Sequence, residues 1–228
     1  MINARNLAIS IFCGLLSVHF IHAQDLSRYR EFQLGTNLPT IAKQAGLEPS
    51  AARVIHQRPV LIQELTWQPL FSTSSSPQTD PVWNTLFSFY NGELFQIVVN
   101  YKRNKTAGLT AEDLVEAISA MYGTATAPAA EITFSFSGVY NDSAVVIARW
   151  EDSQYSFNLF RSSYQPAFGM IAVSKRLDTL ARAAAIEAIR LDKQEAPQRE
   201  IERQRKQDEG NRSGQEKARL VNKPKFRP

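Results

Sequence analysis

The 228 residues carry a formal net charge of +4, which is divided unevenly along the chain. Residues 24–174 hold 10 Lys and Arg against 13 Asp and Glu, whereas residues 175–228 hold 15 against 9. The first segment, which we call the body, has a net charge of −3, which excludes a nucleic-acid-binding domain. The second segment, the tail, has a net charge of +6 and could contact phosphates, anionic lipid headgroups or cell-wall polymers. Acids and bases alternate in this tail, which is typical of a solvated helix or a disordered segment.

Residues 1–23 are predicted to be a cleavable secretory signal peptide. Arg5 supplies the positive start, residues 7–21 supply a short apolar stretch, and Ala23 supplies the small residue before the cut. The mature protein is therefore expected to begin at Gln24. The apolar stretch is too short for a stable membrane span, and no later segment approaches about 18 continuous apolar residues. We expect no membrane span.

The single cysteine, Cys13, lies within the predicted signal peptide. It is poorly placed for lipid attachment, because the bulky Phe12 precedes it where such sites have a small residue. Its removal leaves a mature chain of roughly 205 residues without a thiol or a disulfide, which is large enough to be stabilised by its own core. This composition favours a periplasmic or secreted protein of a bacterial envelope.

The first unit of the body begins with the sequence FQLGTNLPTIAKQAG. Thr36 or Asn37 can cap a short helix there, and Gly46 can end it. A second short helix is expected over residues 50–57, followed by a strand over residues 60–67.

A Ser-, Thr- and Pro-rich loop is expected over residues 68–81, followed by the strongest local pattern in the chain. Two alternating segments, residues 86–90 and 93–101, flank Asn91-Gly92, a pair suited to the positive φ angles of a two-residue hairpin turn. This spacing predicts an antiparallel hairpin.

The second unit begins with the sequence GLTAEDLVEAISAMYG, which predicts a helix. Thr110 and Asp113 have the spacing of a capping box, and Gly123 can end the helix. The period then changes to alternation, which predicts strands. These strands are expected over residues 132–136, 144–150, 154–162 and 168–174.

The chain is expected to end in an amphipathic helix over residues 176–197, which Pro197 should stop or kink. The charged remainder, residues 198–228, is expected to be disordered. With a first αβ repeat over residues 24–106 and a second over residues 107–175, the sequence predicts an α+β fold. Its two repeats would form one antiparallel sheet with helices on one face.

Both units open on a similar short motif. It comprises Leu34, Gly35 and Thr36 followed by Ile41 in the first unit, and Gly108, Leu109 and Thr110 followed by Val115 in the second. This pattern behind a signal peptide resembles the superfamily of BLIP and BamE/SmpA envelope domains. The resemblance implies non-enzymatic protein binding in the envelope. The chain departs from this superfamily because its mature part lacks both the disulfides of the tandem inhibitors and a well-placed lipidated cysteine.

No catalytic residue, metal site or cofactor is predicted. The mature chain keeps one histidine, His56, so it has no Cys/His pair and no zinc set of several His or Cys side chains. The adjacent acids Glu112 and Asp113 suit the first turn of a helix, and Glu151 and Asp152 suit a hairpin turn. An enzyme without a recognisable motif stays open as an alternative.

The hairpin register suggests a binding face for a protein partner in the envelope. A two-residue turn would pair Phe89 with Leu94 and Phe87 with Gln96, placing both phenylalanines on the same face as Gln96. In the second hairpin, Arg149 and Asn158 share a face. We therefore name Phe87, Phe89, Gln96, Arg149 and Asn158 as candidate binding residues.

Two alternatives stay open for this surface. The Ser-rich loop or the C-terminal helix could instead cover Phe87 and Phe89, which would make them core residues. The protein could also act as an envelope scaffold that contacts an anionic surface through its basic tail.

Overall fold

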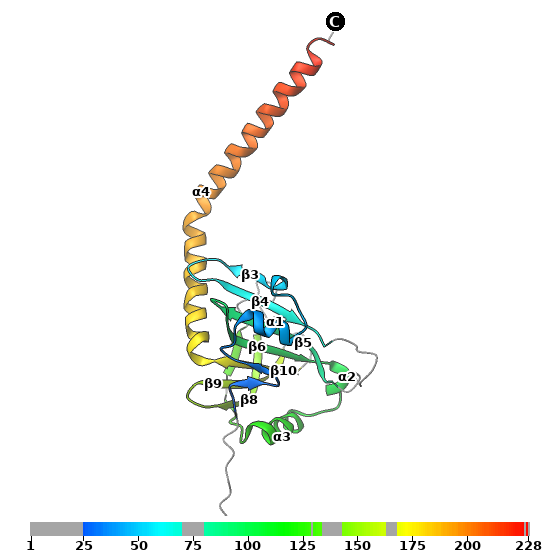
Figure 1. Cartoon of the computed structure of the whole chain (residues 1–228), viewed down its shortest axis with the longest axis vertical. Coiled ribbons are helices and arrows are strands. Elements are labelled where there is room, and N and C mark those ends of the chain that lie inside the picture. The colour runs from blue at the N-terminus through cyan, green and yellow to red at the C-terminus, as the bar shows by residue number, and fades with distance from the viewer. Residues whose placement is uncertain are drawn as a thin grey trace, which may run out of the picture.

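A computed structural model describes residues 25–69, 80–128, 130–133, 143–162, 168–225 and 227. Within these ranges the chain is a mixed helix and sheet protein, in which a large antiparallel sheet carries packed helices and a long C-terminal helix projects away (Figure 1). The strands of the large sheet are β3 (Arg53–His56), β4 (Ile62–Trp67), β5 (Val82–Tyr90), β6 (Glu93–Tyr101), β7 (Ala130–Thr133), β8 (Ser143–Glu151), β9 (Tyr155–Ser162) and β10 (Phe168–Ser174). The remaining elements are β1 (Arg28–Tyr29), β2 (Phe32–Gln33), α1 (Leu38–Gln44), the 3₁₀ turn η1 (Pro49–Ala51), α2 (Arg103–Thr106), α3 (Ala111–Tyr122) and α4 (Lys175–Asn222).

The eight strands are ordered β3-β4-β5-β6-β10-β9-β8-β7. Strands β3 to β6 form one half of the sheet and β7 to β10 form the other, and the antiparallel pairing of β6 with β10 joins them. The last strand along the chain therefore lies in the middle of the sheet.

The central hairpin contains a β-bulge that the sequence pattern did not predict. Its turn residues Asn91 and Gly92 have φ angles of 50° and 83°, as predicted, and Phe89 pairs with Leu94. The register then shifts, because Phe95 is an extra residue in β6. The predicted pairing of Phe87 with Gln96 is therefore wrong, since Phe87 lies opposite Ile97.

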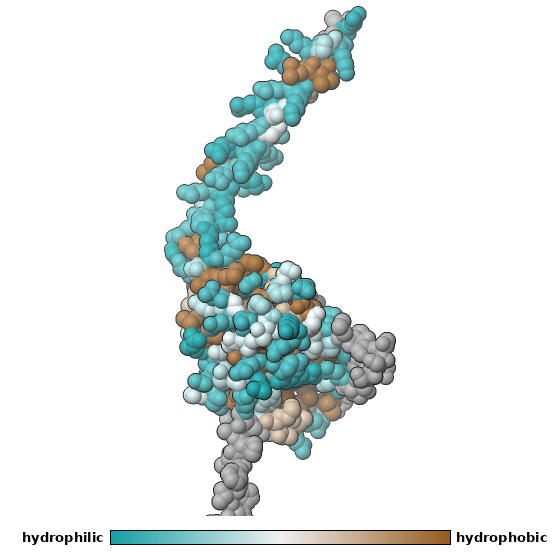
Figure 2. Space-filling view, viewed as in Figure 1, coloured by the Kyte–Doolittle hydropathy of each residue, from teal (hydrophilic) through white to brown (hydrophobic). Residues whose placement is uncertain are grey.

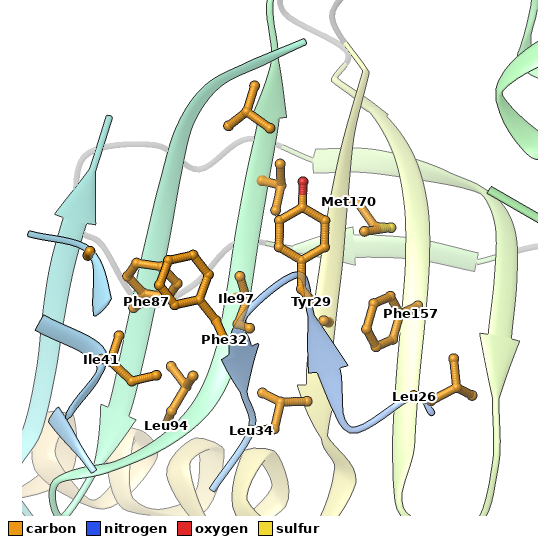
Figure 3. Close-up of a cluster of buried hydrophobic side chains, with 14 of the residues drawn as sticks. Leu26, Tyr29, Phe32, Leu34, Ile41, Phe87, Leu94, Ile97, Phe157 and Met170 are labelled. Carbon is orange, nitrogen blue, oxygen red and sulfur yellow. The ribbon is translucent and has the colours of Figure 1, made fainter. Parts of the chain in front are cut away.

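The main core lies on one face of the sheet, under the β1–β2 hairpin and the helices α1 and α3 (Figure 3). The rings of Phe32 and Phe87 are 4.6 Å apart between centroids, so the hairpin is packed directly on the sheet. Trp150, at 1% exposure, donates its indole N–H to the carbonyl of Gly123 at 2.9 Å, which fixes the end of α3 to β8.

The helix α4 packs on the opposite face, so the expectation of helices on one face is wrong. Its Leu177 and Ala181 contact Ile62 and Phe95, which point away from the main core. Figure 3 shows this helix behind the strands. The physical reason is that β4 to β6 carry apolar side chains on both faces, and both sets must be removed from water.

Local cap chemistry explains where the shorter helices begin. Asn37 caps α1 by accepting from the backbone N–H of Thr40, and Thr110 and Asp113 form the predicted capping box of α3. The helix expected over residues 50–57 does not form. Pro49 begins only one 3₁₀ turn, and residues 53–56 are the edge strand β3.

The helix α4 continues well past Pro197, so the expectation of disorder over residues 198–228 is wrong for the described part of that range. Pro197 lies inside the helix, and Figure 1 shows the helix changing direction where it leaves the sheet. Alternating charges explain the continuation, because acids and bases three or four residues apart pair along the helix surface. Beyond Pro197 such pairs are Glu200 with Arg203 and Arg205 with Glu209.

Two glycines with different surroundings test this packing. A Cβ at Gly169, in β10, would lie 2.7 Å from the carbonyl oxygen of Val99 and would collide with the ring of Phe160, whereas a Cβ at Gly210 meets nothing within 4 Å. We expect Gly169→Ala to lower the free energy of unfolding by about 1–3 kcal/mol. Gly210→Ala should leave it equal or raise it by less than about 1 kcal/mol. Urea unfolding measures both, and equal stability of the two variants would contradict the packing at Gly169.

Candidate functional site

The five predicted binding residues do not form one exposed surface. Phe87 and Phe89 are fully buried in the main core, between the sheet and the elements that cover it. Gln96, Arg149 and Asn158 carry their polar groups on the other face, because the bulge at Phe95 separates Gln96 from the two phenylalanines. The structure therefore selects the alternative in which Phe87 and Phe89 belong to the core.

Arg149 and Asn158 share a face of neighbouring strands, as predicted, and the structure places them directly opposite each other. The Nε of Arg149 donates to Oδ1 of Asn158 at 2.7 Å, and Nδ2 of Asn158 donates to the hydroxyl of Ser156 at 3.0 Å. Ser156 and Asn158 are about 5% exposed. Hydrogen bonds among these side chains compensate for their removal from water, so this group has a structural explanation.

A second row of polar side chains crosses the same face and was not predicted. Glu64, Ser88 and Gln96 are consecutive register partners on β4, β5 and β6, and all three are buried. Arg53 of the edge strand donates to one oxygen of Glu64 at 3.0 Å. The other oxygen of Glu64 and the hydroxyl of Ser88 have no hydrogen-bond partner within the chain. Buried polar atoms of this kind are ordinarily satisfied by bound water.

Tyr29 of the β1–β2 hairpin packs in a cluster with Tyr101 of β6 and Tyr122 of α3. Burial raises the pKa of Tyr29 to about 12 and also raises the pKa values of Tyr101 and Tyr122. Arg30, which adopts a positive φ of 55°, donates both guanidinium nitrogens to Asp80 at 2.8 and 3.0 Å. These hydrogen bonds lower the pKa of Asp80. All these contacts are internal, so the cluster has a stabilising role.

The C-terminal helix is the part of the described chain that extends away from the packed domain. We call residues 192–225 the arm. Residues 196–225 are exposed at every position, and Figure 2 shows the arm covered mainly with hydrophilic side chains. We call residues 192–209 the shaft and residues 210–225 the tip. The exposure of residues 196–225 means that the helix is not packed against the described part of the domain there. Gly210 and Gly214 each lower the stability of the helix by about 1 kcal/mol relative to alanine.

An ion pair between Arg58 and Glu195, which we call the latch, attaches the start of the arm to the domain. Arg58, in the connection between β3 and β4, donates to both carboxylate oxygens of Glu195, with one contact at 2.6 Å. These hydrogen bonds lower the pKa of Glu195. Arg199 lies 3.5 Å from the same carboxylate. Because Pro197 follows two residues after Glu195, the latch holds the helix where its direction changes.

The residues considered for catalysis are dispersed in the structure. His56 lies on the edge strand β3, and Glu112 and Asp113 lie in the first turn of α3, where they favour its positive dipole end. Across the described ranges there is no group of three or more His, Cys, Asp or Glu side chains that could hold a metal ion. No described helix is both long and apolar enough to cross a membrane.

Comparison with models of protein families, with curated proteins and with solved structures found no match to this chain.

Two aromatic residues of β5 test the assignment of the core. Phe87 is fully buried, whereas Trp83 is 58% exposed on the same strand. Phe87→Ala should lower the free energy of unfolding by about 3–5 kcal/mol, because it opens a cavity in the core. Trp83→Ala should change it by less than about 1 kcal/mol. Denaturant unfolding checks both variants, and a Phe87→Ala protein of unchanged stability would restore the interpretation of an exposed binding face.

The tyrosine cluster predicts a loss of stability in alkali. Tyr29 has a folded pKa of about 12 against an ordinary value of 10.0, so the folded state disfavours its ionised form. The free energy of unfolding therefore carries its full contribution from the neutral Tyr29 below pH 10. It falls by up to about 3 kcal/mol for this one group as the pH rises toward 12. Urea unfolding across this pH range should show a shallower decline for Tyr29→Phe. An identical decline in both proteins would contradict the burial of the hydroxyl.

Proposed function

We propose that the protein is a non-enzymatic envelope scaffold, in which a rigid α+β domain is attached to its partner surface through the projecting helix α4. The observation that carries the proposal is the exposure of every residue from 196 to 225. A helix without tertiary contacts contributes little to the stability of the domain, so its role lies outside the stability of the fold. Contact with a partner surface supplies one.

The burial of both sheet faces supports the use of the helix for binding. Phe87, Phe89 and Leu94 are fully buried on one face, and Ile62 and Phe95 are fully buried on the other. A partner could reach these residues only if the covering elements were displaced, and this would cost the hydrophobic stabilisation of the core. Binding through the sheet therefore has less support than binding through the arm.

Export to the envelope is part of the proposal and rests on the order of features in residues 1–23, which lie outside the described residues. Cleavage between Ala23 and Gln24 and a periplasmic or secreted location follow from the same sequence pattern.

We also propose that the two halves of the sheet are structural repeats, as the resemblance to BLIP and BamE/SmpA domains implies. The strand order is symmetric about the contact between β6 and β10, and both α1 and α3 precede a run of four strands. Both helices also contribute to the same core. These features support a tandem arrangement of two αβ units.

Truncation tests the role of the arm. A chain that ends at Arg199 keeps the ion pair between Arg58 and Glu195, and the described residues that it loses, 200–225 and 227, are all exposed. We expect its free energy of unfolding to stay within about 1 kcal/mol of the full chain, because surface residues without tertiary contacts contribute little. In a bacterium that exports both proteins, fractionation should place the full chain with the envelope and the truncated chain in the soluble periplasmic fraction. Retention of the truncated chain in the envelope fraction would overturn the scaffold proposal.

A further inference from the structure

Charge is divided sharply between the shaft and the tip of the projecting helix. The shaft, residues 192–209, holds five Lys and Arg against six Asp and Glu, whereas the tip, residues 210–225, holds five against one. The net charge is thus −1 in the shaft, near the domain, and +4 in the tip, at the far end.

The cations of the two segments also differ in their partners. Within the shaft, Arg199 pairs with Asp192, Arg203 pairs with Glu200, and Arg205 lies 3.9 Å from Glu209. Among the described residues, no tip cation forms an ion pair with any acid of the chain, and all five are exposed. The tip cations are Arg212, Lys217, Arg219, Lys223 and Lys225. They are available to an external anion, whereas three of the five shaft cations form ion pairs within the chain.

Apolar side chains accompany the cations at the tip. Leu220 is 77% exposed and Val221 is 54% exposed, and Figure 2 shows a hydrophobic group near the end of the arm. At 3.6 residues per turn, positions 212, 219 and 223 fall on one side of the helix and positions 214, 218 and 221 fall on the other. Arg212, Arg219 and Lys223 therefore form one basic row, whereas Val221 lies opposite it beside Lys217, and Leu220 lies between the two sides.

We infer that the tip binds the anionic headgroups of a phospholipid bilayer and anchors the domain to the membrane surface. This inference rests on the proposed role of α4 as the attachment arm. A soluble polyanion would be held by the cations alone and would leave Leu220 and Val221 in water. A bilayer interface accepts both kinds of side chain, because the headgroups attract Lys and Arg while the apolar groups enter the boundary region.

The length of the arm then sets the height of the domain above the membrane. The helix rises 1.5 Å per residue, so the 12 residues between Pro197 and Gly210 span about 20 Å. The shaft, with a net charge of −1, is not attracted to the anionic headgroups, and the tip alone reaches them.

Sedimentation with lipid vesicles tests this inference on the mature full-length chain. Vesicles of equal parts phosphatidylglycerol and phosphatidylcholine should bind the protein at least about tenfold more strongly than vesicles of phosphatidylcholine alone, with weakening at high salt. Two triple variants remove the same charge from different segments. The tip variant carries Arg212→Gln, Arg219→Gln and Lys223→Gln, whereas the matched shaft variant carries Arg199→Gln, Arg203→Gln and Arg205→Gln.

The tip variant should lose at least about tenfold in vesicle binding, and the shaft variant should lose much less. A third variant, Leu220→Ser with Val221→Ser, should weaken binding at unchanged net charge, which a purely electrostatic polyanion site would not show. Equal losses in the two triple variants would overturn the assignment to the tip. Binding to soluble heparin but not to vesicles would overturn the choice of lipid.

The two proposals fail in different ways. If the protein does not bind vesicles but still requires residues 200–228 to fractionate with the envelope, the lipid inference is wrong and the scaffold proposal stands. If the truncated chain remains in the envelope fraction, the arm is not the attachment element, and the scaffold proposal is wrong whatever the vesicles show.

Discussion

One extra residue in β6 determines how both faces of the sheet are used. The bulge at Phe95 allows Leu94 to enter the main core under α1, while Phe95 itself packs against Leu177 and Ala181 of α4. A regular strand would shift the residues after it to the opposite face. Ile97 would then leave the main core, and the sheet would bury a different set of side chains against its helices. The attachment of α4, and therefore the position of the arm, depends on this local irregularity.

Local sequence patterns predicted several elements well because the causes are local. The strands over residues 93–101 and 168–174 have the predicted bounds, and Thr110 and Asp113 form the expected capping box. The bulge was not predictable, because Leu94, Phe95, Gln96 and Ile97 give no indication of which residue is the extra one. The burial of Phe87 follows from that bulge and from the β1–β2 hairpin, which is far away in sequence.

Of the two polar groups on the face opposite the main core, one depends on local sequence and the other does not. The shared face of Arg149 and Asn158 was predictable from the alternation of two neighbouring strands. The row of Glu64, Ser88 and Gln96 joins three strands, so no short window of sequence contains it. For the arm, the basic excess was visible in composition. The helix beyond Pro197, and with it the contrast between a self-paired shaft and an unpaired tip, required the positions of the side chains.

The central place of β10 has a consequence for the order in which the protein can fold during synthesis. Strand β6 needs β10 to complete its pairing, and so does β9, although β6 ends about seventy residues earlier in the chain. A nascent chain that stops before Phe168 therefore has two unpaired strand edges and no means of joining its halves. Folding of the whole sheet must wait for residue 174, near the end of the domain. Late completion of the sheet keeps the chain unfolded until its synthesis is nearly finished, which is compatible with the export that we propose.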